Sequence, residues 1–322
     1  MIVLTGAAGF IGSYVARKLN SYGITDLVLV DDFTQENKIA NFAAIDALAR
    51  VDRTMLFETL RSLEYQGKID AFIHLGARTD TTEQNTQIFD ELNVQYSQKV
   101  WQYCAENNVA LIYASSAATY GDGSKGYDDH TLPAELQPLN PYGRSKNDFD
   151  RWALEQTETP PYWLGLKFFN VYGPNEYHKG RMASVVFHAF NQIRETGKMR
   201  LFRSHKEGYK DGEQKRDFIF VDDIAEYIWF AYKCQPQAGL LNMGTGEARS
   251  FLDLVHAVFK AMDREPQIEF IDTPEDIRDS YQYFTEAETA KLKATEYNRP
   301  FHSLEEGVEK YVKQYLIEGK HY

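Results

Sequence analysis

Three glycines placed directly after the first apolar segment limit the folds open to this chain. Residues 2–4 are apolar, and the spacing GxxGxxG follows at once, with Gly6, Gly9 and Gly12. Glycines at this spacing allow a tight strand-to-helix turn and let backbone amides approach a pyrophosphate at the helix N-terminus. Asp31 ends the next apolar segment, about 20 residues after the last glycine, where a carboxylate can bind the adenosine ribose. The pattern predicts dinucleotide binding.

The first half of the chain alternates short apolar segments with helix-like stretches. Near-continuous apolar strands separated by helices indicate a parallel sheet that is covered on both faces. We therefore expect an α/β protein with a Rossmann-type doubly wound parallel sheet. The expected strands are residues 2–4, 27–30, 71–75, 111–114 and 163–168, and the expected helices are residues 11–21, 39–49, 89–107 and 142–158.

The second half of the chain has shorter elements that lie further apart. It includes a helix-like stretch at 182–196 and a last amphipathic stretch from Leu304. We expect residues 1–170 to form the dinucleotide-binding domain and residues 171–322 to form a smaller C-terminal α/β lobe that binds substrate. Residues 216–250 are expected to return in part to the first domain.

The charge balance and the cysteines exclude several classes of protein. The 322 residues include 35 Lys and Arg against 47 Asp and Glu, a formal charge of −12, which argues against nucleic-acid and anionic-membrane partners. Cys104 and Cys234 lie far apart with no CxxC motif or His-rich segment nearby, so we expect no disulfide and no metal site. The chain lacks a signal-peptide pattern and an apolar run of about 20 residues. We expect a cytoplasmic protein with reduced thiols.

A serine, a tyrosine and a lysine have the spacing of a catalytic acid–base centre. Ser116 ends a buried strand, and open parallel sheets bind ligands beyond the carboxyl ends of their strands. Pro141 is suited to start the next helix, which places Tyr142 and Lys146 four residues apart on one face. Free tyrosine has a pKa of about 10, and a nearby ammonium group lowers the pKa of a phenol. We expect Tyr142 to transfer protons and Ser116 to hydrogen-bond the reacting oxygen.

Together with the glycine motif, these residues resemble the extended short-chain dehydrogenase/reductase superfamily, which includes nucleotide-sugar epimerases and dehydratases. Residues 113–121, 168–185, 215–223 and 241–251 are more specifically similar to the ADP-glyceromanno-heptose 6-epimerase family, and HKGRMASV at 178–185 is the most specific stretch. The resemblance covers nearly the whole chain. It implies an isomerase that epimerises C6 of ADP-D-glycero-D-manno-heptose by hydride transfer to and from bound NADP, and so supplies heptose for lipopolysaccharide.

The resemblance also implies a second proton-transfer residue. Taking hydrogen from one face of a carbon and returning it to the other requires an acid–base group on each face. By match to the family motif, these groups are Tyr142 and Lys179. A lysine acts as a base only when its pKa is lowered, and burial or a neighbouring cation such as His178 or Arg181 can lower it.

The glycine motif and the resemblance give the remaining expected contacts. The expected cofactor-binding residues are Gly6, Gly9, Phe10, Ile11, Gly12, Asp31, Asp32, Lys38, Arg53, Leu75, Gly76, Ala77, Arg78, Thr79, Asn93, Lys146, Val171 and Lys179. The expected substrate-binding residues are Asn170, Arg181, His188, Phe202, Arg203, Ser204, His205, Arg216 and Tyr281.

The choice between NADP and NAD depends on four of these side chains. Asp31 and Asp32 would repel a 2′-phosphate and favour NAD. Lys38 and Arg53 would attract that phosphate and favour NADP. Because the charges nearly cancel, the resemblance decides, and we expect NADP with NAD as the alternative.

The sequence leaves two other functions open. Another nucleotide-sugar 4-epimerase or a 4,6-dehydratase would keep Ser116, Tyr142 and Lys146 but would not need Lys179. A non-catalytic dinucleotide-sensing protein is a more distant alternative. Such a protein typically loses the tyrosine or the lysine of the YxxxK motif, and this chain keeps both. Members of the family are often homopentamers, so the resemblance also implies a homo-oligomer.

Overall fold

A computed structural model of the chain describes residues 1–62, 64–278 and 282–322. The elements of its first half are β1 (Ile2–Thr5), α1 (Phe10–Ser21), β2 (Leu27–Asp31), α2 (Ile39–Phe42), β3 (Ala49–Asp52), α3 (Leu56–Thr59), β4 (Ala71–His74), α4 (Thr86–Phe89), α5 (Tyr96–Glu106), β5 (Ala110–Ser116), α6 (Pro141–Leu154) and β6 (Trp163–Phe168). Those of its second half are β7 (Asn170–Tyr172), α7 (Val185–Thr196), β8 (Met199–Phe202), β9 (Lys215–Phe220), α8 (Val221–Cys234), β10 (Gly239–Met243), β11 (Ala248–Ser250), α9 (Phe251–Ala261), β12 (Ile268–Ile271), α10 (Glu275–Arg278), α11 (Ala290–Ala294) and α12 (Leu304–Tyr311).

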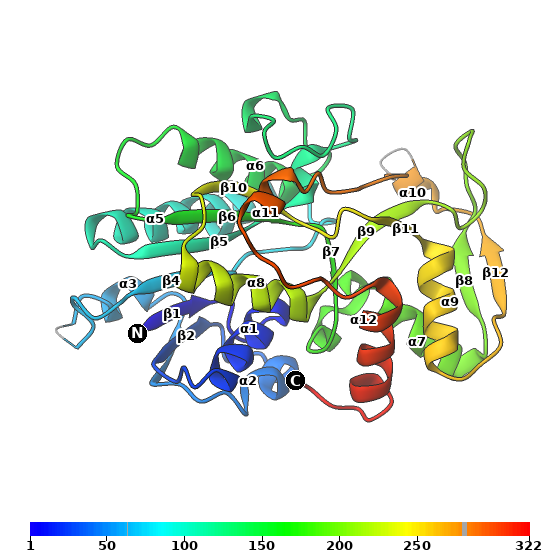
Figure 1. Cartoon of the computed structure of the whole chain (residues 1–322), viewed down its shortest axis with the longest axis horizontal. Helices are drawn as coiled ribbons and strands as arrows, with labels where there is room; N and C mark the ends of the chain where they lie inside the picture. The colour runs from blue at the N-terminus through cyan, green and yellow to red at the C-terminus, as the bar shows by residue number, and fades with distance from the viewer. Residues whose placement is uncertain (63, 279–281) are drawn as a thin grey trace.

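A seven-stranded sheet organises the larger part of the molecule. Its strand order is β10-β6-β5-β4-β1-β2-β3, and every strand pairs in parallel with its neighbours. Helices cover both of its faces (Figure 1). This is the doubly wound α/β sheet expected from the sequence, so the predicted fold class is confirmed.

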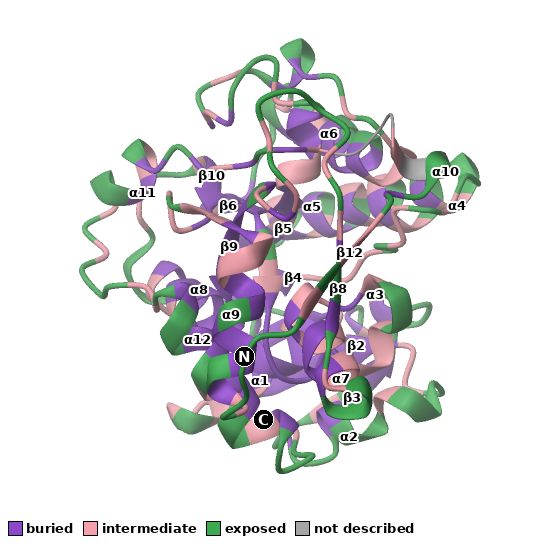
Figure 2. Cartoon of the chain, turned by 90° about the vertical axis from the view of Figure 1, so that its right-hand side faces the viewer, coloured by how far each residue is buried: buried purple, intermediate pink, exposed green. Residues whose placement is uncertain are grey.

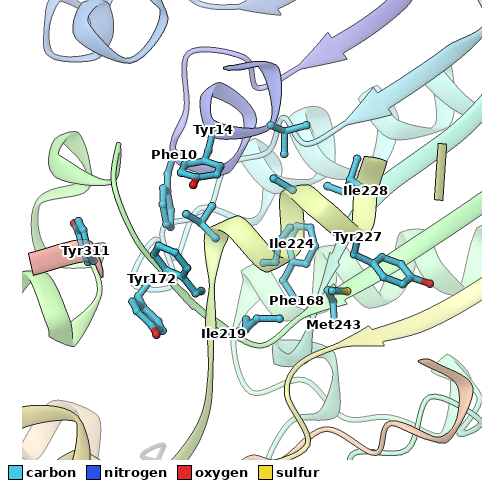
Figure 3. Close-up of a cluster of buried hydrophobic side chains, with 14 of the residues drawn as sticks. Phe10, Tyr14, Phe168, Tyr172, Ile219, Ile224, Tyr227, Ile228, Met243 and Tyr311 are labelled. Atoms are coloured by element: carbon cyan, nitrogen blue, oxygen red, sulfur yellow. The ribbon is translucent and has the colours of Figure 1, made fainter. Parts of the chain in front are cut away.

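Alternate residues of each strand face opposite layers of helices. Ile2 and Leu4 of β1 belong to one apolar cluster with α1 and α8, whereas Val3 belongs to a second cluster with α5 and α6. Figure 3 shows part of the first cluster, with Tyr14 from α1 and Ile224 from α8. Since both faces of the sheet are buried, its central strands are apolar at most positions, which explains their near-continuous apolar sequence.

One predicted helix is wrong. Residues 39–49 were expected to form a single helix, but α2 ends at Phe42 and the chain then turns into β3, which pairs in parallel with β2. The Asn20 side chain fixes this turn, because it bonds both the backbone N–H and the carbonyl oxygen of Asp46. Only Val51 is buried in β3, so this edge strand has too little apolar sequence to be recognised.

The smaller lobe contains two further sheets. Strands β11, β9 and β7 form one, and β12 and β8 form the other. Helix α9 packs against both α7 and α12 (Figure 1). Figure 2 shows that buried residues gather along the sheets and the helix faces that cover them. We propose a boundary near residue 170, with β10 returning to the larger sheet beside β6.

Across the described ranges, the helices are all too short or too polar to cross a lipid bilayer.

Candidate active site

The turn between β1 and α1 depends on glycine. Gly6 has φ +72°, and a Cβ at this position would lie 2.7 Å from the backbone nitrogen of Gly76. A Cβ on Gly12 would overlap the carbonyl oxygen of Gly6. Helix α1 has Gly9 as its N-cap, with no side-chain cap and no acidic residue in the first turn. The first amides of the helix are therefore available to an anion.

A cavity of about 370 Å³ lies over this turn. Its backbone amides, a strand-end carboxylate and four Lys and Arg side chains fit the phosphates and the ribose of a dinucleotide. The expected cofactor residues that line it are Gly6, Gly9, Phe10, Ile11, Gly12, Asp31, Lys38, Arg53, Leu75, Gly76, Ala77, Arg78, Thr79 and Lys179.

Four residues expected at the cofactor do not line this cavity: Lys146 and Val171 line a second cavity, and Asp32 and Asn93 line neither. Asp32 accepts hydrogen bonds from Thr34 and Gln35 in the turn after β2, and these bonds lower the pKa of its carboxyl to about 2. Asn93 bonds both the backbone N–H and the carbonyl oxygen of Arg78, at 2.8 and 3.0 Å. Asn93 therefore shapes the cavity wall through the backbone of its neighbour.

A second cavity of about 330 Å³ adjoins the first. Lys179 and Met182 line both, so the two cavities meet beside these side chains. The expected residues that line only the second cavity are Ser116, Tyr142, Lys146, Asn170 and Val171. The proton-transfer residues predicted from two separate motifs thus lie around one space.

The start of α6 places Tyr142 and Lys146 as the sequence predicted. The Asn140 side chain caps the helix by accepting a hydrogen bond of 2.8 Å from Gly143, and Pro141 occupies the first turn. Ser116, at the end of β5, hydrogen-bonds the Tyr142 hydroxyl. The Lys146 ammonium group donates to the carbonyl oxygen of Ala114 at 2.8 Å.

The pKa of Tyr142 differs from the sequence-based expectation. Burial raises the pKa of the Tyr142 hydroxyl, and the hydrogen bond from Ser116 only opposes this shift. The charged group that acts on Tyr142 is Asp150, which raises the pKa further, whereas the Lys146 ammonium group donates to a backbone carbonyl. Burial instead lowers the pKa of Lys146 itself, to about 8.

A buried ion pair lies next to these residues. Lys167 on β6 and Asp150 on α6 are 2.7 Å apart, and both side chains are fully buried. Asp150 also accepts hydrogen bonds from Tyr113 at 3.1 Å and Ser115 at 2.6 Å, and Lys167 donates to Thr119 at 2.9 Å. The pair satisfies its polar atoms within the core and links α6 to β5 and β6.

We expect Lys167→Met to lower the free energy of unfolding by about 3–5 kcal/mol, because it leaves the Asp150 carboxylate buried without its counter-charge. Urea unfolding followed by circular dichroism measures the change. Lys198→Met is the matched control, because Lys198 pairs with Glu269 at half-exposed positions and should lose at most about 1 kcal/mol. Equal losses of unfolding free energy in the two variants would show that the buried pair stabilises the fold no more than the exposed pair does.

Lys179 lies in a short helical segment, Tyr177–Met182, that is kinked at Gly180, where φ is 54°. Its amine makes no hydrogen bond or ion pair with any described residue. Burial lowers the pKa of Lys179; Glu176 opposes this shift and Lys38 adds to it. A lowered pKa is what a lysine base requires.

The source of the neighbouring charge was predicted incorrectly. Burial lowers the pKa of His178 to about 4, so its ring is neutral at pH 7, and Arg181 is exposed. Lys38, which lines the first cavity with Lys179, supplies the cationic environment instead.

Most of the expected substrate residues lie outside the two cavities. Arg216 is buried, and its guanidinium lies over the ring of Phe251, which lines the second cavity, with 5.6 Å to the ring centroid. Arg203 pairs with Asp272 at 3.3 Å beyond the ends of β8 and β12. The others outside the cavities are Arg181, His188, Phe202, Ser204 and His205, and Tyr281 lies outside the described residues.

The structure adds cavity residues that sequence reasoning missed. Tyr96 lines the first cavity, and its hydroxyl donates to the carbonyl oxygen of Arg53. It follows Asn93 by three residues, about one helical turn. Glu176 lines the second cavity and lies three residues before Lys179, within the motif at 168–185. Phe218 and Phe251 give this cavity apolar walls, and no sequence motif signalled their role.

Residues 2–244 match the NAD dependent epimerase/dehydratase family, so the chain belongs to this family. It is 47% identical to an ADP-L-glycero-D-manno-heptose-6-epimerase of Fusobacterium nucleatum over the full length of both chains. It is 46% identical to the protein of the same name from Nitratidesulfovibrio vulgaris, over 98% of each chain. The crystal structure of the Helicobacter pylori protein of that name matches with a TM-score of 0.80 and 26% identity, covering 97% and 95% of the two chains. The resemblance seen in the sequence motifs is confirmed.

Proposed function

We propose that the protein interconverts ADP-D-glycero-D-manno-heptose and ADP-L-glycero-D-manno-heptose at C6 of the heptose. The observation that carries the proposal is that Tyr142 and Lys179, from separate segments of the chain, line one cavity beside a site that fits a dinucleotide. A 4-epimerase or a dehydratase would not need the lysine. The names of the relatives support the same substrate.

The two proton-transfer residues are suited to opposite tasks. A bound nicotinamide dinucleotide supplies the hydride acceptor and donor for the sugar carbon. Burial keeps the Tyr142 phenol protonated at neutral pH, so it can donate a proton to the C6 oxygen. The lowered pKa of Lys179 favours its neutral amine, which can accept a proton from that oxygen on the other face. In the reverse direction the two residues exchange these roles.

The apolar walls of the second cavity suit a substrate group that must turn. Phe218, Phe251 and Leu254 line it and offer no side-chain hydrogen bond to the heptose. Excluding water strengthens the interactions of Tyr142 and Lys179 with the C6 oxygen. A sugar end that meets apolar walls on one side is less tightly fixed there and can present either face to the dinucleotide site.

We expect the purified protein to carry NADP. Asp32 is engaged with Thr34 and Gln35, and Lys38 lies 3.3 Å from Asp31 and offsets its charge. The Arg53 guanidinium lines the cavity and has no hydrogen bond or ion pair with a described residue, so it is available to a 2′-phosphate. Mass spectrometry of the released nucleotide measures the preference. Chiefly NAD in the wild-type protein would mean that the Asp31 carboxylate governs the site.

The test of the function is direct. Purified protein incubated with ADP-D-glycero-D-manno-heptose should produce the L-glycero epimer, separated by chromatography against both standards. Formation of no L epimer by protein that carries dinucleotide would exclude the proposal. A parallel reaction with UDP-glucose tests the alternative, because UDP-galactose as product would indicate a 4-epimerase.

We propose that the enzyme works in the cytoplasm as a homo-oligomer, in the supply of heptose for lipopolysaccharide. Cys104 and Cys234 are both free thiols, as suits a reducing compartment. The oligomeric state follows from the family resemblance alone, and light scattering of the purified protein measures it.

A further inference from the structure

A buried asparagine joins the glycine turn to the segment that carries Lys179. Asn41 of α2 is 2% exposed, and its side-chain amide donates to the carbonyl oxygens of Ala8, at 3.1 Å, and Asn175, at 3.0 Å. These two acceptors fix the orientation of the amide. The amide oxygen of Asn41 then lies 2.8 Å from Nδ1 of His321. Because an amide oxygen can only accept a hydrogen bond, the proton of the neutral His321 ring is on Nδ1.

Residues 320–322 also contact the Lys179 segment, and the C-terminus lies beside α2 (Figure 1). The Tyr177 hydroxyl donates to the carbonyl oxygen of Lys320 at 2.8 Å, and the Tyr177 ring meets the edge of the His321 ring with centroids 4.7 Å apart. The backbone N–H of Tyr322 donates to the Asn175 side chain at 2.9 Å. The ring of Tyr322 stacks on Tyr14 of α1 at 4.0 Å.

The Lys179 segment is only partly enclosed. The residues of Tyr177–Met182 are half-buried or exposed, and the kink at Gly180 is exposed. Two hydrogen bonds anchor the residues just before Tyr177: the Asn175 side chain donates to Ser13, and the Ser184 hydroxyl donates to Glu176. The contacts of Asn41 and of residues 320–322 with the segment therefore provide much of its attachment to α1 and α2.

We propose that Asn41, Tyr177 and His321 are positioning residues that hold Lys179 at the junction of the two cavities. The inference rests on the proposed function, because it assigns these residues to the second proton transfer. Tyr177 and His321 line neither cavity, whereas Asn41 also bonds the glycine turn at Ala8. The loss of Tyr177 or His321 should therefore impair only the chemistry that uses Lys179. A misplacement of about 1 Å at a reacting group costs roughly 100-fold in rate.

His321→Ala tests this proposal most sharply. In single-turnover reactions started from each epimer in turn, the appearance of reduced nicotinamide absorbance reports hydride transfer from C6, which requires the first base to take the proton of the hydroxyl group. One epimer uses Tyr142 for this step and the other uses Lys179. We expect oxidation of one epimer to stay within about 3-fold of wild type and oxidation of the other to slow by at least about 10-fold. Bound nucleotide should be unchanged.

Three further variants separate positioning from general stability. His302→Ala removes a histidine hydrogen bond of the same length, 2.8 Å to Asp223, away from the Lys179 segment. It should change the oxidation rates of the two epimers by the same factor. His321→Asn keeps a donor near the Nδ1 position and should recover part of the lost rate. Tyr177→Phe removes only the bond to Lys320 and should show the same asymmetry in weaker form.

The outcomes distinguish this inference from the proposed function. If the wild-type protein oxidises neither epimer, the proposed function fails. If the wild type interconverts them but His321→Ala slows both epimers equally, in step with a lower unfolding temperature, the three residues are merely structural. Wild-type rates from both epimers in His321→Ala would equally overturn the inference.

Discussion

Lys179→Met should lower epimerisation in both directions by roughly 10²–10⁴-fold, the range that a lost acid–base group typically produces. Either direction uses both proton-transfer residues in turn, so removing one blocks both directions. Methionine keeps the length and the apolar stem of the side chain but cannot exchange a proton. Conversion of each ADP-heptose epimer into the other, followed by chromatography, measures the loss.

The controls for this variant separate chemistry from folding. The protein should retain its dinucleotide and its unfolding temperature, because no described residue hydrogen-bonds or pairs with the Lys179 amine. An aldehyde analogue of the substrate, which can be oxidised and reduced in one orientation, should still react. Lys198→Met, an exposed lysine, should behave as wild type. Retention of a tenth or more of wild-type epimerisation by Lys179→Met would mean that Tyr142 serves both faces.

Tyr142→Phe should lower turnover by at least about 100-fold while the dinucleotide stays bound. Only the hydroxyl is lost, and the ring still fills its place beside Phe89. The variant leaves the Lys146 bond to Ala114 intact, so the base of the site should keep its shape. Steady-state rates and the nucleotide content of the purified variant are the two measurements.

The outcome of Tyr142→Phe also bears on the role of Ser116. A variant with near-wild-type turnover would remove Tyr142 from the mechanism and leave the hydrogen bond from Ser116 without a catalytic purpose. In the single-turnover experiment, Tyr142→Phe should slow the epimer that His321→Ala spares. The same epimer slowed by both variants would contradict the assignment of one residue to each face.

Much of the fold could be predicted because the central strands are buried on both faces. Strands β1 and β5 begin or end within two residues of the apolar segments that indicated them. The edge strand β3 was missed because burial of Val51 alone leaves no apolar pattern. The apolar pattern thus predicted the strands that are buried on both faces. It failed for β3, which is a strand because it pairs with β2 and not because its own sequence is apolar.

The candidate site divides in the same way. The glycine turn and the helical spacing of Tyr142 and Lys146 are local, so the sequence indicated them. The pKa of Tyr142 depends on burial, which only the folded chain determines. The effect of Lys38 on Lys179 and the contact of Asn41 with His321 join residues far apart in the chain, and no spacing rule brings them together.

The position of β10 affects how the chain can be divided. This strand covers the free edge of β6, yet the intervening residues include β7, β8 and β9. A fragment that stopped near residue 170 would leave the backbone of β6 unpaired along that side, and exposed strand edges promote association between chains. The nucleotide-binding half is therefore not a separable module: a shortened version made for ligand screening should aggregate unless residues 239–243 are supplied to complete the sheet.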